Sequence, residues 1–180
     1  MKKRFGIDID GTVTCPTSFI PHINKKFQLN ITLDDLTEYE ITDCLDLPEK
    51  DVYEWFMQSE AKLYTEAPLA TGAKTILNTE APLATGAKTI LNTWFHDHEL
   101  YFISARHHRA MEITESYFLN HAIDFHHIEL IGSHDKVGTA KKYSVDLFFE
   151  DKHDNAVAIS EELNIPVILF DTPYNRKAIL

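Results

Sequence analysis

The second half of the chain alternates between short apolar segments and segments with helical spacing, and this alternation constrains the fold most. The apolar segments are rich in β-branched and aromatic residues, so strands are expected at residues 4–10, 100–105, 128–132, 145–151 and 166–171. Helices are expected between the last four, at residues 109–121, 136–143 and 155–164. Such alternation is typical of βαβ crossovers. The sequence therefore predicts an α/β, Rossmann-like core, whose parallel sheet is covered by helices on both faces.

Residues 15–64 do not follow this rhythm, because they contain several apparent helices and no convincing strand. Pro48 fits the first position of one helix, where Glu49 and Asp51 would favour the first turn. A small all-helical cap inserted after strand 1 is therefore expected over the carboxyl ends of the strands, where open α/β sheets bind ligands. The predicted domains are a core at 1–14 and 84–180, a cap at 15–64, and a cap-to-core linker at 65–83.

The linker contains the first copy of an exact repeat, because TEAPLATGAKTILN occupies residues 65–78 and again residues 79–92. Two identical units do not make a solenoid, so we interpret them as a recent or engineered tandem duplication. The second copy continues into Trp94 and Phe95, which share a helix face with residues 90–91. The second copy is therefore expected to pack on the sheet. The first copy would be extra chain, with Ile76 and Leu77 needing other burial.

Composition and charge limit the kinds of partner that this chain could have. Its 180 residues are 44% hydrophobic and 25% charged, as in an ordinary globular domain. The net charge of −11 argues against a nucleic-acid polymer as partner, but it permits a small phosphorylated substrate. No apolar run approaches a membrane span, and Asp8 interrupts any signal peptide. With only two cysteines, Cys15 and Cys44, a cytoplasmic location is expected.

The sequence DIDGT at residues 8–12 follows the first predicted strand directly. Asp8 and Asp10 would lie at the carboxyl edge of the sheet, with Gly11 allowing a sharp turn. Two carboxylates so close repel each other unless a cation lies between them, and Mg²⁺ suits that position. The alternative is an ordinary acidic turn.

Further polar residues follow the next strands in order. Ser104 ends the second strand, Lys136 follows the third, and Glu150 and Asp151 end the fourth. Taken singly, they could be a capping serine, a surface lysine and an acidic turn. The carboxyl ends of parallel strands meet at one edge, however, so the sequence predicts that these side chains converge around a phosphate.

This order of residues resembles the haloacid dehalogenase-like superfamily, whose four motifs match DIDGT, Ser104, Lys136 and Glu150–Asp151. The resemblance implies that Asp8 attacks phosphorus to form an aspartyl-phosphate, and that Asp10 serves as general acid and then general base. Mg²⁺ would be held by the Asp8 carboxylate, the Asp10 backbone carbonyl and Asp151. Members with dehalogenase or phosphonatase chemistry lack the second aspartate, so Asp10 indicates phosphate transfer.

The resemblance also implies roles for Ser104 and Lys136, and the other candidates follow from their places in the sequence. Ser104 and Lys136 would bind phosphate oxygens. Arg106 would contact phosphate or sugar, or else be a solvated loop arginine. Supporting positions would be Thr12, Glu150 and Asp154.

Within the superfamily, the helical insertion and residues 81–94 are similar to the cytosolic 5′(3′)-deoxyribonucleotidases and their bacterial relatives. Glu150 departs from that group, which often has Asp there. The implied substrate is a nucleoside monophosphate. Phe19, Tyr39 and Trp55 could stack on its base, or could simply form the core of the cap.

Other functions also fit parts of the pattern. A phosphatase for sugar phosphates or other small metabolites would share the chemistry, and only the cap would distinguish it. A catalytically inactive nucleotide-binding protein, or one like a phospho-receiver domain, would share some motif residues. The ten histidines lack the spacing of a zinc site and are expected at the surface or at strand ends. Residues 171–175 would either shape the pocket edge or form a turn.

Overall fold

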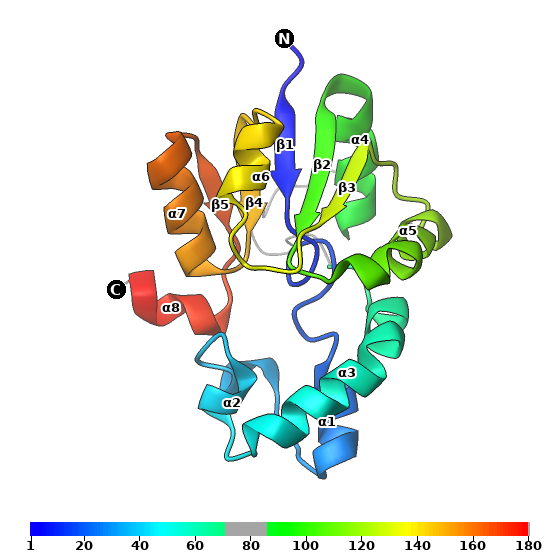
Figure 1. Ribbon diagram of the computed structural model, residues 1–180, viewed down its shortest axis with the longest axis vertical. Coiled ribbons are helices and arrows are strands. Elements are labelled where there is room, and N and C mark those ends of the chain that lie inside the picture. Colours follow the sequence, from blue (N-terminus) through cyan, green and yellow to red (C-terminus); the bar gives the residue numbers. More distant parts are fainter. Residues whose placement is uncertain (71–85, 180) are drawn as a thin grey trace, which may run out of the picture.

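The computed structural model describes residues 1–70 and 86–179, and its centre is a five-stranded sheet (Figure 1). The strands are β1 (Arg4–Ile7), β2 (Glu99–Ser104), β3 (His127–Leu130), β4 (Leu147–Glu150) and β5 (Val167–Leu169). They lie in the order β3-β2-β1-β4-β5, and each adjacent pair is parallel. The predicted α/β architecture is confirmed. Strands β1, β3, β4 and β5 are shorter than their apolar segments, whereas β2 has the expected six residues and begins one residue earlier.

The strands alternate side chains between two helical layers, because successive residues of a strand point to opposite faces. On β2, Leu100 and Phe102 join the core cluster that includes Leu91 and Phe118. Tyr101 and Ile103 join a second cluster, with Ala140 and Ile159 among its members. Helices α4 (Gly86–Asp97) and α5 (Met111–Asn120) therefore cover one face, and α6 (Val137–Lys142) and α7 (His153–Leu163) the other (Figure 1).

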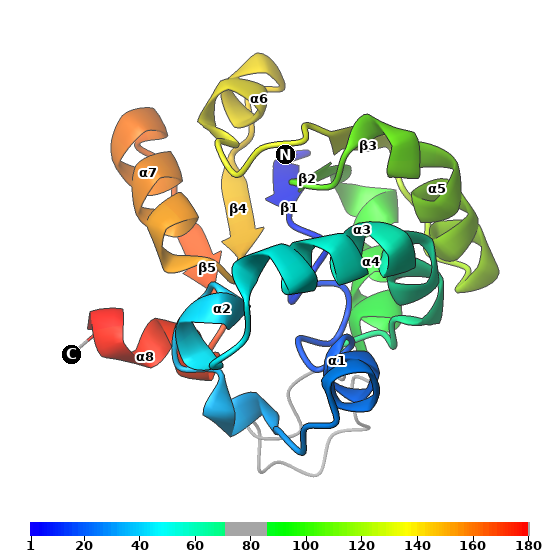
Figure 2. The same cartoon turned by 60° about the horizontal axis from the view of Figure 1, so that its bottom comes forward.

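The cap has its own apolar cluster, which meets one cluster of the sheet at Phe56. It consists of α1 (Ile20–Phe27), the 3-10 turn η1 (Leu33–Asp35), α2 (Ile41–Cys44) and α3 (Glu49–Glu66). Ile23, Trp55 and Leu63 are buried together in it. Figure 2 shows α3 crossing the carboxyl ends of the strands, as the predicted cap should. Pro48 precedes the first residue of α3 instead of occupying it.

Two short elements complete the connections around the sheet. The 3-10 turn η2 (His108–Ala110) leads into α5, and the C-terminal helix α8 (Pro173–Ile179) follows β5. In Figure 1, α8 lies between the sheet and the cap. No helix in the described ranges combines the length and the apolarity that crossing a membrane requires.

The described structure uses part of each repeat copy. From the first copy, Thr65 and Glu66 end α3, and Leu69 forms an antiparallel bridge with Thr14. From the second copy, α4 packs on β2 as expected, with Leu91 buried and Trp94 against the core. The carbonyl of Ala70 accepts a hydrogen bond from the Ala87 N–H at 3.2 Å. The described fold therefore uses the first copy up to Ala70 and the second copy from Gly86 onward.

This arrangement differs from our expectation that the whole first copy would be extra chain. Its first six residues, from Thr65 to Ala70, belong to the described fold. Ile76 and Leu77, for which other burial was expected, lie outside the described residues. The exact domain limits remain a prediction.

Candidate active site

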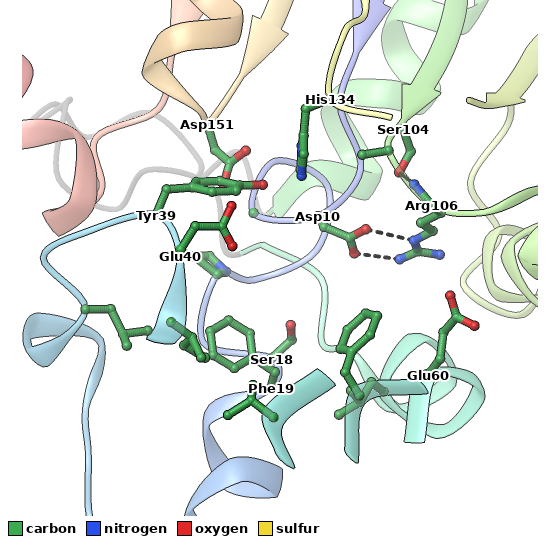
Figure 3. A pocket seen from close by; sticks show the side chains of 18 of the residues that line it. Asp10, Ser18, Phe19, Tyr39, Glu40, Glu60, Ser104, Arg106, His134 and Asp151 are labelled. Carbon is green, nitrogen blue, oxygen red and sulfur yellow. Dashed lines mark hydrogen bonds and ion pairs between the residues drawn. The ribbon is translucent and has the colours of Figure 1, made fainter. Parts of the chain in front are cut away.

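A pocket of about 740 Å³ lies between the cap and the carboxyl ends of the strands (Figure 3). The core contributes the polar side of its lining, including Asp8, Asp10, Ser104, Lys136 and Asp151. The cap contributes apolar and aromatic side chains, among them Phe19, Leu36, Tyr39, Ile41, Val52, Phe56 and Tyr64, together with the charged residues Glu38, Glu40, Glu49, Lys50 and Glu60. The predicted convergence of the motif residues on one place is therefore seen in the structure.

The chain turns sharply after β1 and leaves Asp8 and Asp10 in different surroundings. Asp8 continues the ladder, because its N–H donates to the Phe149 carbonyl at 3.0 Å, and its side chain is buried. Gly11 then has a φ of +86°, which an L side chain rarely adopts. A Cβ at Gly11 would also lie 2.1 Å from Asp151 Oδ2, so this turn is packed directly against the end of β4.

Lys136 is the cation at the centre of the polar end. Its Nζ donates to Asp8 Oδ1 at 2.5 Å and to Glu150 Oε2 at 2.8 Å. Burial alone would lower the pKa of Lys136, but the two carboxylates outweigh burial and raise this pKa above its ordinary value. Lys136 therefore stays charged, and it holds the Asp8 side chain in place.

Glu150 organises the turn after β4 as well as pairing with Lys136. Its Oε1 accepts hydrogen bonds from the backbone N–H groups of Asp151 at 3.2 Å and Lys152 at 3.1 Å. The glutamate side chain is one methylene longer than that of aspartate, and it thus reaches both Lys136 and the backbone N–H groups that follow it. This contact pattern gives the Glu at this position a structural explanation.

The donor atoms of Asp8, Glu150 and Asp151 lie within 4.8 Å of one another, and all three residues are buried. Three carboxylates around one lysine leave an excess of negative charge in a buried place. Carboxylate oxygens are the ligands that Mg²⁺ prefers. The donor set and its charge therefore fit a magnesium ion. Burial raises the pKa of Asp8 well above its usual range, with Lys136 opposing this.

Asp151 is fixed by the start of α8. The Tyr174 hydroxyl donates to Asp151 Oδ2 at 2.6 Å, and the Asn175 amide donates to the Asp151 carbonyl at 2.5 Å. Burial and the neighbouring Glu150 raise the pKa of Asp151 to about 7. Tyr174 and Asn175 therefore shape the site, one of the two alternatives considered for residues 171–175.

Asp10 points toward the second strand and away from the carboxylate cluster (Figure 3). Its two oxygens accept hydrogen bonds from Arg106, at 2.8 Å from Nε and 2.7 Å from Nη2. The same guanidinium donates from Nη1 to Thr114 Oγ1 at 3.0 Å. The Asp10 carboxylate is thus not part of the group that could hold a metal, and ligation through its backbone carbonyl stays a prediction.

Of the other predicted site residues, only some line the pocket. Ser104 lines the pocket, and its hydroxyl accepts a hydrogen bond from the Arg106 N–H at 3.2 Å. Thr12 is buried, and its hydroxyl has no partner among the described residues, but it does not line the pocket. Asp154 lies outside the site, because 89% of its side chain is exposed and it contacts His153.

The three aromatic candidates of the cap have different environments. Phe19 and Tyr39 line the pocket, whereas Trp55 reaches it but is mostly buried in the cap core, packed edge-on to Phe27. The Tyr39 ring lies edge-on to His134 and Tyr174, and Lys152 Nζ lies 4.0 Å from its centroid. Tyr39 therefore connects the cap to the loops after β3 and β4.

Some site residues carried no clear signal in the sequence. Glu60 on α3 is buried and pairs with Arg109 at 2.9 Å across the cap–core boundary. Tyr64, one turn further, stacks on the Arg106 guanidinium at 3.8 Å. The available signal for Glu60 was a charged residue on the helix face that turns toward the core. Its partner, Arg109, is remote in sequence, so the pair itself could not be predicted. Among the described residues, the group that could hold a metal ion consists of Asp8, Glu150 and Asp151, without a histidine.

Comparison with known proteins shows clear relatives, although no protein-family model matches the chain. "Putative nucleotidase BH1399" of Halalkalibacterium halodurans is 45% identical, covering 97% of this chain and 83% of that protein. "Putative nucleotidase YqfW" of Bacillus subtilis is 42% identical, covering 98% and 84%. "Nucleotidase CA_C3379" of Clostridium acetobutylicum is 31% identical, covering 96% and 82%.

Solved structures show the same fold at low sequence identity. A HAD-superfamily hydrolase of Geobacter sulfurreducens is 12% identical with a TM-score of 0.56, covering 99% of this chain and 96% of that chain. A haloacid dehalogenase-like hydrolase of Xanthomonas campestris is 10% identical with a TM-score of 0.56, covering 99% and 94%. Together with the sequence relatives, they show that this chain belongs to the nucleotidase family with the haloacid dehalogenase-like fold.

Proposed function

We propose that this protein is a magnesium-dependent phosphomonoester hydrolase that acts on nucleoside monophosphates through an aspartyl-phosphate. The observation that carries this proposal is the buried group of Asp8, Lys136, Glu150 and Asp151 at the base of the pocket, with Asp10 beside it. The nucleotidase names of relatives up to 45% identical support the same reaction class.

In the first step, an Asp8 carboxylate oxygen attacks phosphorus, and the bond from phosphorus to the ester oxygen breaks. Lys136 bonds one Asp8 oxygen, which leaves the other for the attack. Asp10 gives a proton to the departing alkoxide, which leaves as the neutral nucleoside. Lys136 and the Ser104 hydroxyl would stabilise charge on the phosphoryl oxygens.

In the second step, Asp10 accepts a proton from a water molecule as that water attacks phosphorus. The bond between Asp8 and phosphorus breaks, which restores the Asp8 carboxylate and releases inorganic phosphate. Asp8 and Asp151 would hold the magnesium ion, with the Asp10 backbone carbonyl assigned by the resemblance. When bound, the ion would supply positive charge to the phosphate oxygens.

The cap favours a substrate with a flat apolar part. A nucleoside monophosphate has a charged phosphate at one end and an aromatic base at the other. The pocket shows the same division, with its polar end at Asp8 and its apolar wall around Phe19, Tyr39 and Phe56. Cys15 and Cys44 are both free thiols, which is in keeping with a cytoplasmic enzyme.

Phosphate release from a panel of nucleoside monophosphates and sugar phosphates, with Mg²⁺ and with EDTA, tests this proposal. Release from nucleoside monophosphates that EDTA abolishes is the expected result. Release from sugar phosphates alone would keep the chemistry and contradict the nucleotide substrate. Equal release in EDTA would contradict the role of the metal.

A further inference from the structure

The Arg106 guanidinium and the Asp10 carboxylate form a pair in which burial is very unequal. Only 1% of the Arg106 side chain is exposed, whereas 46% of the Asp10 side chain is. Both guanidinium contacts are short, at 2.8 Å and 2.7 Å, and each goes to a different Asp10 oxygen (Figure 3). The buried residue thus holds the residue that faces the pocket.

Arg106 is itself held on three sides. Thr114 on α5 accepts a hydrogen bond from Nη1, and Tyr64 on α3 covers the guanidinium face at 3.8 Å. The Arg106 backbone N–H donates to Ser104 Oγ, and its carbonyl accepts from the Gly132 N–H at 3.0 Å. The core fixes the guanidinium from behind and the cap fixes it from above, so its position is determined before any substrate binds.

An unrestrained aspartate would present its carboxylate in many orientations, because its terminal torsion is broad. Two parallel hydrogen bonds from one planar guanidinium restrict both the position and the rotation of a carboxylate. A proton donor works only when it lies within hydrogen-bond reach of the leaving oxygen. A fixed orientation of the Asp10 carboxylate therefore favours proton transfer to the leaving oxygen.

We propose that Arg106 is a positioning residue that orients Asp10 for proton transfer to the leaving group. The inference rests on the proposed function, in which Asp10 is the general acid. It replaces the expected role of Arg106 as a phosphate ligand, since the three nitrogens of the guanidinium contact Asp10 and Thr114. The two roles make different predictions, because a phosphate ligand acts on every substrate alike, whereas a positioning residue matters only where the leaving group needs a proton.

The test compares Arg106→Gln with the unchanged protein on two kinds of phosphate ester. The kcat/KM reports the steps up to departure of the leaving group. A nucleoside leaves as a basic alkoxide and needs a proton, whereas the phenolate of p-nitrophenyl phosphate leaves without one. Arg106→Gln should lower kcat/KM about 100-fold for a nucleoside monophosphate and less than about tenfold for p-nitrophenyl phosphate. Asp10→Asn should show the same selectivity.

Two further variants keep the test decisive. Arg106→Lys preserves the charge but cannot bond both oxygens in parallel, so it should show the same selectivity to a smaller degree, and it serves if Arg106→Gln does not fold. Arg4→Gln removes an exposed ion pair with Glu99 at the opposite end of the sheet, and should leave both rates unchanged.

The outcomes separate the inference from the proposed function. An equal loss on both esters in the Arg106 variants would overturn the positioning role while leaving the phosphatase intact. No magnesium-dependent release from either ester by the unchanged protein would overturn the proposed function, and the positioning role with it.

Discussion

The Lys136 ammonium lies 2.5 Å from the Asp8 carboxylate, and 2% and 6% of their side chains are exposed. With Glu150 also in contact, this lysine is what allows carboxylates to be buried together before any metal binds. Removing one partner of a buried ion pair leaves an uncompensated charge, which is more costly than losing the attraction alone. The stability of the fold and the chemistry of the site are thus linked through Lys136.

Lys136→Met should therefore lower the free energy of unfolding by about 3 kcal/mol at neutral pH, and it should also abolish phosphate release. Urea denaturation would measure the loss of stability. Lys142→Met is the matched control, because that lysine pairs with Glu129 at the surface and its removal should change stability by less than about 1 kcal/mol. Similar unfolding midpoints for both variants would contradict the central role of Lys136.

Stability without metal should depend on pH through Asp151. Its pKa in the folded protein is about 7, above its ordinary value, so the folded state favours the protonated carboxyl. The corresponding stability is present in acid and is lost as the pH rises through about 7. Because the unfolded carboxyl ionises near its ordinary pKa of 3.8, the melting temperature in EDTA should fall between about pH 4 and pH 7 and level off above pH 7.

Magnesium should reverse this loss, because it binds the deprotonated carboxylates. The rise in melting temperature on adding Mg²⁺ is expected to be larger at pH 8 than at pH 6, on the two sides of the Asp151 pKa. Asp151→Asn should remove most of the rise at both. An equal rise at both pH values in the unchanged protein would show that these carboxylates do not titrate with the metal.

Gly11 is expected to tolerate no side chain. Its φ of +86° strains an L residue, and a Cβ there would lie 2.1 Å from Asp151 Oδ2. Gly11→Ala should destabilise the protein by about 1–3 kcal/mol and weaken magnesium binding by displacing Asp151. Gly138→Ala is the matched control, since nothing lies within 4 Å of its added Cβ and the residue is helical. That control should be neutral or slightly stabilising, and isothermal titration with Mg²⁺ would compare the two.

The repeat predicts a deletion that the fold should accept. Removing residues 71–84 joins Ala70 directly to Thr85 and restores one copy of the repeated segment. The hydrogen bond from Ala87 to Ala70 would then span three residues, with Gly86 at a φ of +84°, as a type II turn requires. The deletion should keep activity and add about 1–2 kcal/mol of stability by shortening the connection between Ala70 and Gly86.

Adding Gly86→Ala to the shortened chain tests the turn itself. It should cost about 1 kcal/mol, because alanine is strained at that φ. A shortened chain that fails to fold would contradict the view that residues 65–70 and 85–92 can together form one continuous segment.

Much of the core could be predicted because its signals are local. Apolar runs such as the one ending at Glu150 identify strands without any knowledge of their partners, and DIDGT follows its strand directly. The repeat could not be resolved this way, since both copies have the same propensities. Only the contact of Ala70 with Ala87 shows where the fold changes from one copy to the other.

The site partners that were missed are long-range pairs. Arg106 was expected to contact phosphate or sugar, or to be a solvated loop arginine. Its contacts with Asp10 and Tyr64 join segments from β1, the cap and the loop after β2. Asp154 was expected to support the metal because it lies close in sequence to Asp151. The start of α7 directs it to solvent, and Tyr174 from the C-terminal helix contacts Asp151 instead. Such pairings depend on how elements pack, which local patterns do not contain.

The proposed mechanism requires that Asp8 becomes covalently phosphorylated. Rapid acid quenching during turnover of a nucleoside monophosphate with Mg²⁺, followed by borohydride reduction and peptide mass spectrometry, tests it directly, because reduction converts an aspartyl-phosphate to homoserine. Homoserine is expected at position 8, and it should be absent both in Asp8→Asn and in samples without substrate. Phosphate release at the full rate with Asp8 unmodified, or release retained in Asp8→Asn, would contradict covalent catalysis by Asp8.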